Sequence, residues 1–145
     1  MALFDALGVG HFVHCGDVCG TGVLEEMIGR NLTFVWGNMD EPDPGTDAYI
    51  RTLGLTPPGL PPERFEIDGQ RFAVFHGHER GFARSVETLD VDYLLHGHTH
   101  VRRDERIGDR RIINPGALHR ATVKTVATLN PVTDELRFHE IDDGR

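Results

Sequence analysis

The stretch Leu94-Leu95-His96-Gly97-His98-Thr99-His100 decides the fold prediction, because a short apolar run leads directly into three histidines spaced two apart. Imidazole is the commonest metal ligand near neutral pH, and a glycine between the first two histidines permits a tight turn after the strand. A lone pair of histidines at this spacing also has an ordinary reading, as polar residues at a strand end. The rest of the sequence therefore decides which reading holds.

Three further clusters of metal-binding residue types each follow a short apolar run. They are Asp17 in His14-Cys15-Gly16-Asp17, Asn38 and Asp40 in Gly37-Asn38-Met39-Asp40, and His76 and His78 in His76-Gly77-His78. Open α/β sheets bind their ligands beyond the carboxyl ends of their strands. Four strand ends would thus bring oxygen and nitrogen donors to one edge of a sheet, and the sequence predicts a metal site there.

Length and composition predict a globular protein. A chain of 145 residues suits one domain, so we expect a single domain over residues 1–145. No apolar stretch approaches the length of a membrane span, and the first residues lack the basic flank of a targeting signal, so we expect a cytoplasmic protein. A net charge of −8 argues against an extended nucleic-acid-binding surface, which needs basic residues.

The two cysteines, Cys15 and Cys19, lie four apart, which is neither a redox pair nor a disulfide framework. We expect free thiols. If Cys15 lies within the strand, its side chain points away from the neighbouring polar residues, so we expect it to pack in the core rather than bind a metal.

The hydrophobic pattern predicts a layered α/β domain, with strands and helices alternating in the first two thirds and an antiparallel meander at the end. The Asp68-Gly69 pair predicts a hairpin between two of the strands. The expected helices cover residues 2–7, 21–30, 48–53 and 80–89. The expected strands cover residues 11–15, 32–36, 64–67, 71–75, 93–95, 101–107, 110–113, 120–129 and 135–141.

The motifs together resemble those of the calcineurin-like metallophosphoesterases, in particular the small prokaryotic phosphodiesterases, in order and rough spacing over about residues 3–120. The motifs are Gly16-Asp17, Gly37-Asn38-Met39-Asp40, His76-Gly77-His78, Gly97-His98-Thr99-His100 and Asn114-Pro115-Gly116. The resemblance implies an αββα sandwich. It also implies hydrolysis of a small phosphate ester, a diester more than a monoester, by a metal-bound hydroxide that attacks phosphorus in line.

The resemblance also implies roles for individual residues. As metal ligands it implies Asp17, Asn38, His76, His98 and His100, with Asp17 bridging two metals and His100 serving the second. As catalytic residues it implies Asn38 at the substrate phosphate, and Asp40 and His78 orienting ligands and water. The cofactor would be a divalent metal, manganese first, with iron, zinc or nickel as alternatives; the family holds two, and one or two are expected here. Arg120 reads equally well as a surface residue and as a phosphate contact.

This sequence departs from the family pattern in two places. The family begins with a strand ending in Asp-x-His, which supplies two ligands, and no such segment is found here. We therefore expect a sandwich missing its first strand, and at most one tightly bound metal. Met39 stands where many members have a histidine that can protonate the leaving group, so we expect a preference for esters whose leaving group needs no proton.

A second reading is an interaction scaffold with a degraded metal site and little or no catalysis, like the retromer subunit that shares this fold. The five retained ligand types favour an enzyme, since a scaffold does not need them. The exposed strand edge left by a missing first strand makes a homodimer a further expectation.

Overall fold

The structure is a computed structural model that describes residues 1–142. Its elements, in chain order, are α1 (Ala2–Ala6), β1 (Phe12–His14), α2 (Gly22–Glu25), β2 (Leu32–Phe34), α3 (Pro44–Thr52), β3 (Glu63–Ile67), β4 (Gln70–Val74), α4 (Phe82–Thr88), β5 (Tyr93–Leu95), β6 (Arg103–Ile107), β7 (Arg110–Asn114), β8 (Thr125–Asn130) and β9 (Glu135–Glu140). In this part of the chain no helix is long and apolar enough to cross a membrane.

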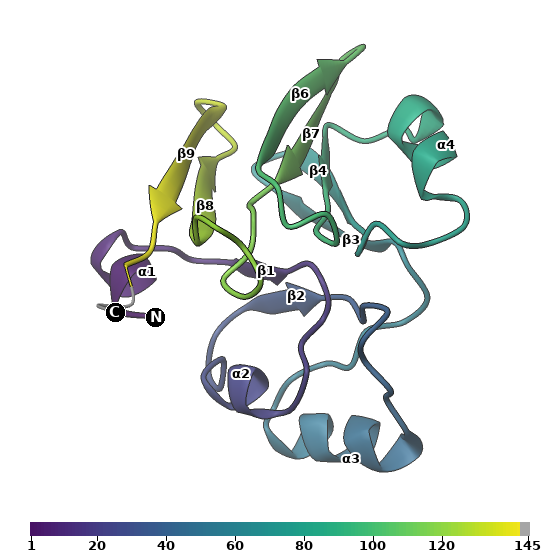
Figure 1. The fold of residues 1–145 in the computed structure, drawn as a ribbon, viewed down its shortest axis with the longest axis vertical. Helices are drawn as coiled ribbons and strands as arrows, with labels where there is room; N and C mark the ends of the chain where they lie inside the picture. Colours follow the sequence, from purple (N-terminus) through teal and green to yellow (C-terminus); the bar gives the residue numbers. More distant parts are fainter. Residues whose placement is uncertain (143–145) are drawn as a thin grey trace.

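A five-stranded mixed sheet, with strand order β3-β4-β5-β7-β6, forms the largest part of the fold (Figure 1). The three central strands are parallel, and β3 and β6 join its edges as antiparallel hairpin partners. The predicted hairpin between β3 and β4 is confirmed. Its turn residues Asp68 and Gly69 both have left-handed backbones, with φ of 51° and 76°, as a two-residue turn of this kind requires.

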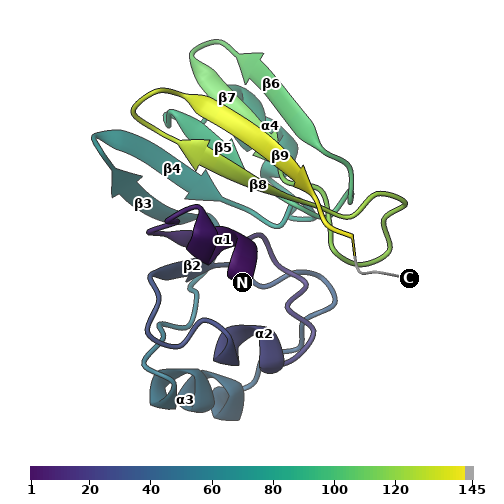
Figure 2. The same cartoon turned by 90° about the vertical axis from the view of Figure 1, so that its left-hand side faces the viewer.

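The large sheet is covered on both faces, α4 on one side and the β8–β9 hairpin on the other (Figures 1 and 2). Alternation along each strand separates the two interfaces, because successive side chains point to opposite faces. On β4, Ala73 packs with the α4 residue Val86, while its neighbour Phe72 packs in a separate cluster with Leu129 and Leu136 of the hairpin.

A second layer is built on β1 and β2, which pair in parallel as the predicted strand-helix-strand unit requires. Phe12 of β1 and Phe34 of β2 form a core with Leu24 of α2 and Ile50 of α3, so these helices cover the outer face of the layer. Helices thus lie outside two layers of strands. This confirms the predicted αββα architecture.

Two predicted helices differ from those observed in where they begin and end. The predicted helix over 21–30 is wrong in length, since α2 ends at Glu25; the Thr21 hydroxyl bonds the Glu25 carboxylate and does not cap the backbone. Conversely, α3 begins four residues before the predicted start, at Pro44. The Asp43 side chain accepts a hydrogen bond from the Thr46 backbone N–H at 2.7 Å and closes a capping box.

Two antiparallel pairs of the predicted meander after residue 100, β6–β7 and β8–β9, are confirmed, but the predicted step from β7 to β8 is wrong, because β7 pairs with β5 and β6 and not with β8. β7 lies beside β5 in the large sheet and runs parallel to it, whereas β8 and β9 form a two-stranded sheet of their own. The strand predicted over 120–129 begins only at Thr125. Residues 115–124 are instead a loop, and that loop reaches the candidate site.

Candidate active site

Four loops that follow β1, β2, β4 and β5 carry the predicted site residues, and hydrogen bonds or close approaches hold these loops together. The Gly97 N–H after β5 donates to the carbonyl of His76 after β4, with N and O 2.9 Å apart. A Cβ atom added to Gly97 would lie 3.0 Å from the carbonyl oxygen of Cys15, after β1. The carboxyl ends of strands from both layers therefore meet at one place.

Four of the predicted residues converge there. The Asn38 Oδ1 atom lies 3.0 Å from His76 Nε2 and 3.0 Å from His98 Nδ1. The two imidazole nitrogens are 3.2 Å apart, and the Asp17 Oδ2 atom lies 3.4 Å from His76 Nε2. A carboxylate, a carboxamide and two imidazoles thus meet around one point.

The orientation of His76 sends a lone pair into this cluster. His76 is buried, and its Nδ1 lies 2.6 Å from the carbonyl oxygen of Cys15. Because a carbonyl can only accept a hydrogen bond, Nδ1 carries the proton and Nε2 presents its lone pair to Asn38 and Asp17. That arrangement is typical of a metal-binding histidine, whose second nitrogen donates to a carbonyl or carboxylate.

Three of the predicted ligands have left-handed backbones. The φ angles are 55° at Asp17, 65° at His98 and 58° at His100. This conformation costs about 1 kcal/mol or more per residue for side chains other than glycine, and it tends to persist where the surroundings enforce it, commonly at functional sites. Here each such residue sits just past a strand end.

Glycines allow the loops to approach so closely. A Cβ atom added to Gly37 would lie 2.1 Å from Asp17 Oδ1 and 2.3 Å from the Asp17 backbone nitrogen. At Gly16, which has a φ of 89°, an added Cβ would lie 2.6 Å from His76 Nδ1. Gly16 and Gly37, each from a predicted motif, are therefore required by the space available at the site.

Asp40 binds backbone and does not face into the cluster. Its Oδ2 accepts hydrogen bonds from the backbone N–H groups of Val18, at 3.0 Å, and Gly37, at 2.7 Å, and its Oδ1 accepts one from Cys19 at 2.8 Å. The carboxylate therefore fastens the loop after β1 to the loop after β2. Its effect on chemistry would come through the positions of Asp17 and Asn38.

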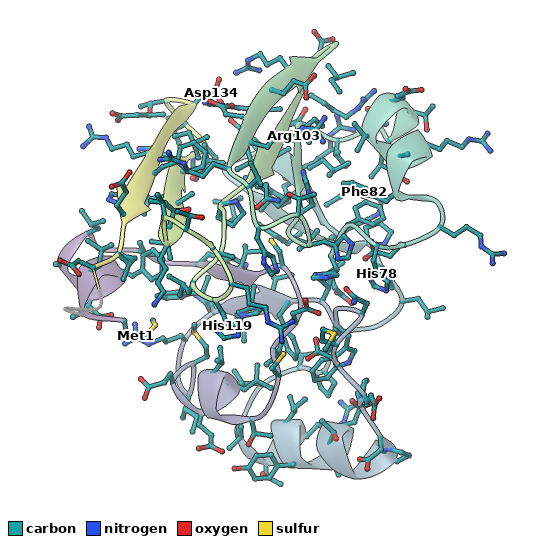
Figure 3. The ribbon with its side chains drawn as sticks, in the orientation of Figure 1. Met1, His78, Phe82, Arg103, His119 and Asp134 are labelled. Carbon is teal, nitrogen blue, oxygen red and sulfur yellow. The ribbon has the colours of Figure 1, made fainter. Side chains whose placement is uncertain are left out.

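His78 lies beside the cluster. Its ring centroid is 5.1 Å from that of His76 and 6.1 Å from that of His98, and over a third of its side chain is exposed. Figure 3 shows it between the large sheet and the β1–β2 layer. A partly exposed side chain in this position can contact a ligand that is bound at the cluster.

The donor set fits a divalent metal. Atoms bonded to one metal at about 2.1 Å are about 3.0 Å apart at right angles and about 3.4 Å apart in a tetrahedron. The four separations above, from 3.0 to 3.4 Å, fall in that range. Within residues 1–142 no three His, Cys, Asp or Glu side chains are grouped to hold a metal by themselves, so binding would depend on the Asn38 carboxamide.

The fifth predicted ligand, His100, makes a different contact. Its Nδ1 lies 3.3 Å from the backbone carbonyl of Arg120. A hydrogen bond to that carbonyl places the proton on Nδ1 and leaves the lone pair on Nε2. His100 is therefore oriented by the 115–124 loop, and its part in metal binding stays a prediction.

Asn114 explains the last of the predicted motifs. It is fully buried, and its amide donates to the Gly97 carbonyl at 2.8 Å and the Thr99 hydroxyl at 3.0 Å. Its Oδ1 accepts from the Gly116 N–H at 2.9 Å. One carboxamide therefore holds the residues on both sides of His98.

Two further residues near the cluster, Glu79 and His14, were not predicted as site residues. Glu79 accepts hydrogen bonds from the backbone N–H groups of His76 and Gly77, both at 2.7 Å, and so shapes the turn after β4. An acid three residues after a histidine could have suggested this. His14 ends β1 with its Nδ1 buried and without a hydrogen-bond partner in the described chain, and burial lowers the pKa of His14.

Both cysteines are free thiols, as predicted. Burial raises the pKa of the Cys15 thiol to about 12, so it stays protonated at neutral pH. A metal ligand would have to be a thiolate, so Cys15 does not belong to the donor set.

Comparison with known proteins places the chain in a family. Residues 1–134 match the calcineurin-like phosphoesterase superfamily domain. The chain belongs to that superfamily. Membership confirms the resemblance seen in the sequence, and it places this calcineurin-like phosphoesterase among the hydrolases that act on phosphate esters.

Individual relatives are similar over almost the whole chain. Phosphodiesterase MJ0936 of Methanocaldococcus jannaschii is 25% identical over 144 residues, which cover 96% of this chain and 86% of that protein. The solved structure of a novel archaeal phosphodiesterase superimposes with a TM-score of 0.83 at 24% identity, covering 97% of this chain and 88% of that one. Zinc-bound Vps29 of Entamoeba histolytica has the same coverages, with a TM-score of 0.61 at 22% identity.

Proposed function

We propose that this calcineurin-like phosphoesterase is a metal-dependent phosphodiesterase whose metal is held by Asp17, Asn38, His76 and His98. One observation carries the proposal: these side chains come from positions up to 81 apart in sequence (17 to 98), yet the donor atoms of Asn38, His76 and His98 lie 3.0–3.2 Å from one another and Asp17 lies 3.4 Å from His76. The name of the archaeal phosphodiesterase relative supports a diester as the substrate.

A bound divalent metal would act as a Lewis acid that neutralises phosphate charge and activates water for in-line attack. The chain's own residues position that chemistry. Asn38 lies at the cluster and can also meet the substrate phosphate, while Asp40 holds the backbone on either side of the ligands. The His78 ring lies 5.1 Å from the His76 ring and would orient water, and His100 would serve a second metal.

Manganese is the proposed metal. Carboxylate and carboxamide oxygens are hard ligands and imidazoles are borderline, a mixture that suits manganese or iron more than a thiolate-rich zinc site. Titration with manganese, iron, zinc and nickel salts would rank them by activity and by affinity.

The test is hydrolysis of bis-nitrophenyl phosphate with and without added manganese. We expect manganese-dependent hydrolysis that His98→Ala abolishes, because one of the four donors is gone. His139→Ala is the matched control, since His139 lies on β9 and pairs with the Thr128 hydroxyl at 2.8 Å. Absence of hydrolysis with every metal, or a His98→Ala variant as active as the parent, would contradict the proposal and favour a scaffold.

A further inference from the structure

The loop over residues 115–124 is fastened at its start. The Thr125 hydroxyl donates to the Pro115 carbonyl at 2.7 Å, and the Thr125 N–H donates to the Ala117 carbonyl at 3.1 Å. A Cβ atom on Gly116 would lie 2.0 Å from the Thr125 hydroxyl oxygen, so only glycine fits at this position of the loop. Together with Asn114, these contacts set the direction in which the loop leaves the sheet.

That direction brings Arg120 to the candidate site. Its backbone carbonyl lies 3.3 Å from His100 Nδ1, and Arg120 itself has a left-handed φ of 53°. Its neighbour His119 lies in Figure 3 at the junction of the large sheet with the β1–β2 layer, as His78 does. A long exposed side chain held in this strained conformation commonly marks a functional position.

The backbone of Arg120 lies beside the loop that carries one of the four donors. His100, whose Nδ1 contacts the Arg120 carbonyl, comes two residues after His98. The exposed Arg120 side chain therefore leaves the backbone next to the loop that presents His98.

A phosphodiester anion entering this site would meet the Asp17 carboxylate, with the carboxylates of Asp40 and Glu79 behind the adjoining backbone, on a chain with a net charge of −8. A cation at the entrance offsets that repulsion. Guanidinium presents a rigid fork of N–H donors that matches two oxygens of a phosphate. Within residues 1–142 Arg120 forms no ion pair with a carboxylate, whereas Arg103, Arg111 and Arg137 each do.

We propose that Arg120 is a substrate-binding residue, whose guanidinium contacts a non-bridging oxygen of the phosphate bound at the four-donor cluster. The proposal rests on the proposed function for the identity of the ligand. It assigns the 115–124 loop to substrate recognition. Of the two interpretations of Arg120 from the sequence, a surface residue or a phosphate contact, it favours the phosphate contact.

The test uses inorganic phosphate as the probe and the manganese-loaded protein. Arg120→Asn removes the positive charge, and asparagine tolerates a left-handed backbone. Arg120→Lys keeps the charge but loses the paired N–H donors of the guanidinium. Arg51→Gln, on the exposed last turn of α3, is the matched control. Calorimetry gives phosphate affinity, and bis-nitrophenyl phosphate gives KM and kcat separately.

For Arg120→Asn we expect phosphate affinity about tenfold weaker and a KM about tenfold higher, with kcat within about twofold, because the contact is made in both ground and transition states. Arg120→Lys should fall between, and Arg51→Gln should match the parent. Metal content and melting temperature should not change in any variant, since the side chain is exposed. The difference between parent and Arg120→Asn should shrink at high salt.

Phosphate affinity in Arg120→Asn equal to that of the parent would overturn the proposal, and so would a parent protein that binds manganese but no phosphate. A parent that binds phosphate through Arg120 yet hydrolyses no ester would support this inference while contradicting the proposed function. Calorimetry therefore distinguishes a failure of the Arg120 proposal from a failure of the proposed function.

Discussion

At the scale of single residues, the site is a set of close approaches that only particular side chains permit. Asp17 and His98 both have left-handed backbones, and their side chains turn toward His76 and Asn38 respectively. Gly37 leaves room for the Asp17 carboxylate, and Asp40 ties the two loops together through backbone N–H groups. The strain therefore depends on small neighbours and on hydrogen bonds to the main chain.

Gly37→Ala should displace Asp17. The added methyl would overlap both the side chain and the backbone nitrogen of Asp17, so we expect a loss of about 2–3 kcal/mol in the free energy of unfolding and weaker metal binding. Gly10→Ala is the control, because a Cβ there meets nothing within 4 Å. Urea unfolding of both variants measures the difference. Equal stabilities would show that Asp17 can move away without loss.

Met39 is more than half exposed, and its backbone N–H donates to Asp17 Oδ1 at 3.0 Å. A thioether cannot donate a proton, so hydrolysis should depend on leaving-group pKa more steeply than in Met39→His. We expect Met39→His to increase the rate of hydrolysis most for esters with poor leaving groups, by about tenfold or more. A series of aryl and alkyl phosphodiesters measures the slope. Parent rates that are equal across widely different leaving groups would contradict the prediction.

At the scale of elements, the β8–β9 hairpin is held to the large sheet by apolar packing and by one polar clamp. The Tyr93 hydroxyl of β5 and the guanidinium of Arg111 on β7 both donate to Asp134 Oδ1 in the hairpin turn, at 2.8 and 2.7 Å. Arg111 Nε also donates to Asp104 Oδ1 of β6 at 2.8 Å. The clamp fixes the hairpin, and hence the 115–124 loop that leads into it.

Arg111→Met should loosen this clamp in a pH-dependent way. The hydrogen bond from Arg111 lowers the pKa of Asp104. Burial raises the pKa of Asp134, but the hydrogen bonds from Tyr93 and Arg111 together outweigh burial, so that the pKa is lowered. Carboxyls with lowered folded-state pKa values contribute stability above the ordinary value of 3.8 and lose it as pH falls through the lowered values.

The variant should therefore lose about 1–2 kcal/mol at pH 7, since both carboxylates are partly exposed, and the difference from the parent should shrink below pH 3.8. Thermal unfolding at pH 7 and pH 3 measures it. Arg137→Met removes an exposed ion pair with Glu135 and should change stability by less than about 0.5 kcal/mol. A loss that is equal at both pH values would show that packing of the arginine, and not its charge, matters.

At the scale of the whole molecule, the site exists only where the two layers meet. Asp17 and Asn38 follow strands of the β1–β2 layer, while His76 and His98 follow strands of the large sheet. Metal bound between them would fasten one layer to the other. The expected homodimer and the cytoplasmic location stay predictions.

Manganese should therefore stabilise the fold. With free metal at about 100 times its Kd, linkage adds about 2.7 kcal/mol, which for a chain of this size raises Tm by about 5–10 °C. Differential scanning fluorimetry with elemental analysis should show one tightly held metal per chain, and EDTA should reverse the shift. His98→Ala should show no shift and His139→Ala the full one. Two tightly held metals per chain would show that His100 completes a second site.

Patterns between near neighbours predicted much of this protein. The apolar runs placed all the strands to within a few residues apart from β8, and Asp68-Gly69 set a hairpin, because side-chain alternation and turn chemistry act between adjacent residues. The rule that parallel strand ends share an edge anticipated that Asp17 lies near Asn38 and His76 near His98, but the predicted single sheet edge is wrong, because the two pairs follow strands of different sheets. The roles of these residues in catalysis stay predictions.

Tertiary structure alone decided the rest. β7 pairs with β5, and β8 pairs with β9 outside the large sheet. Burial against residues far along the chain selects the partner of each strand, and an apolar run does not specify that partner. Asp40 turned to backbone N–H groups, and His100 turned to the Arg120 carbonyl. Side chains bond to whatever the fold brings within about 3 Å, and that depends on the whole chain at once.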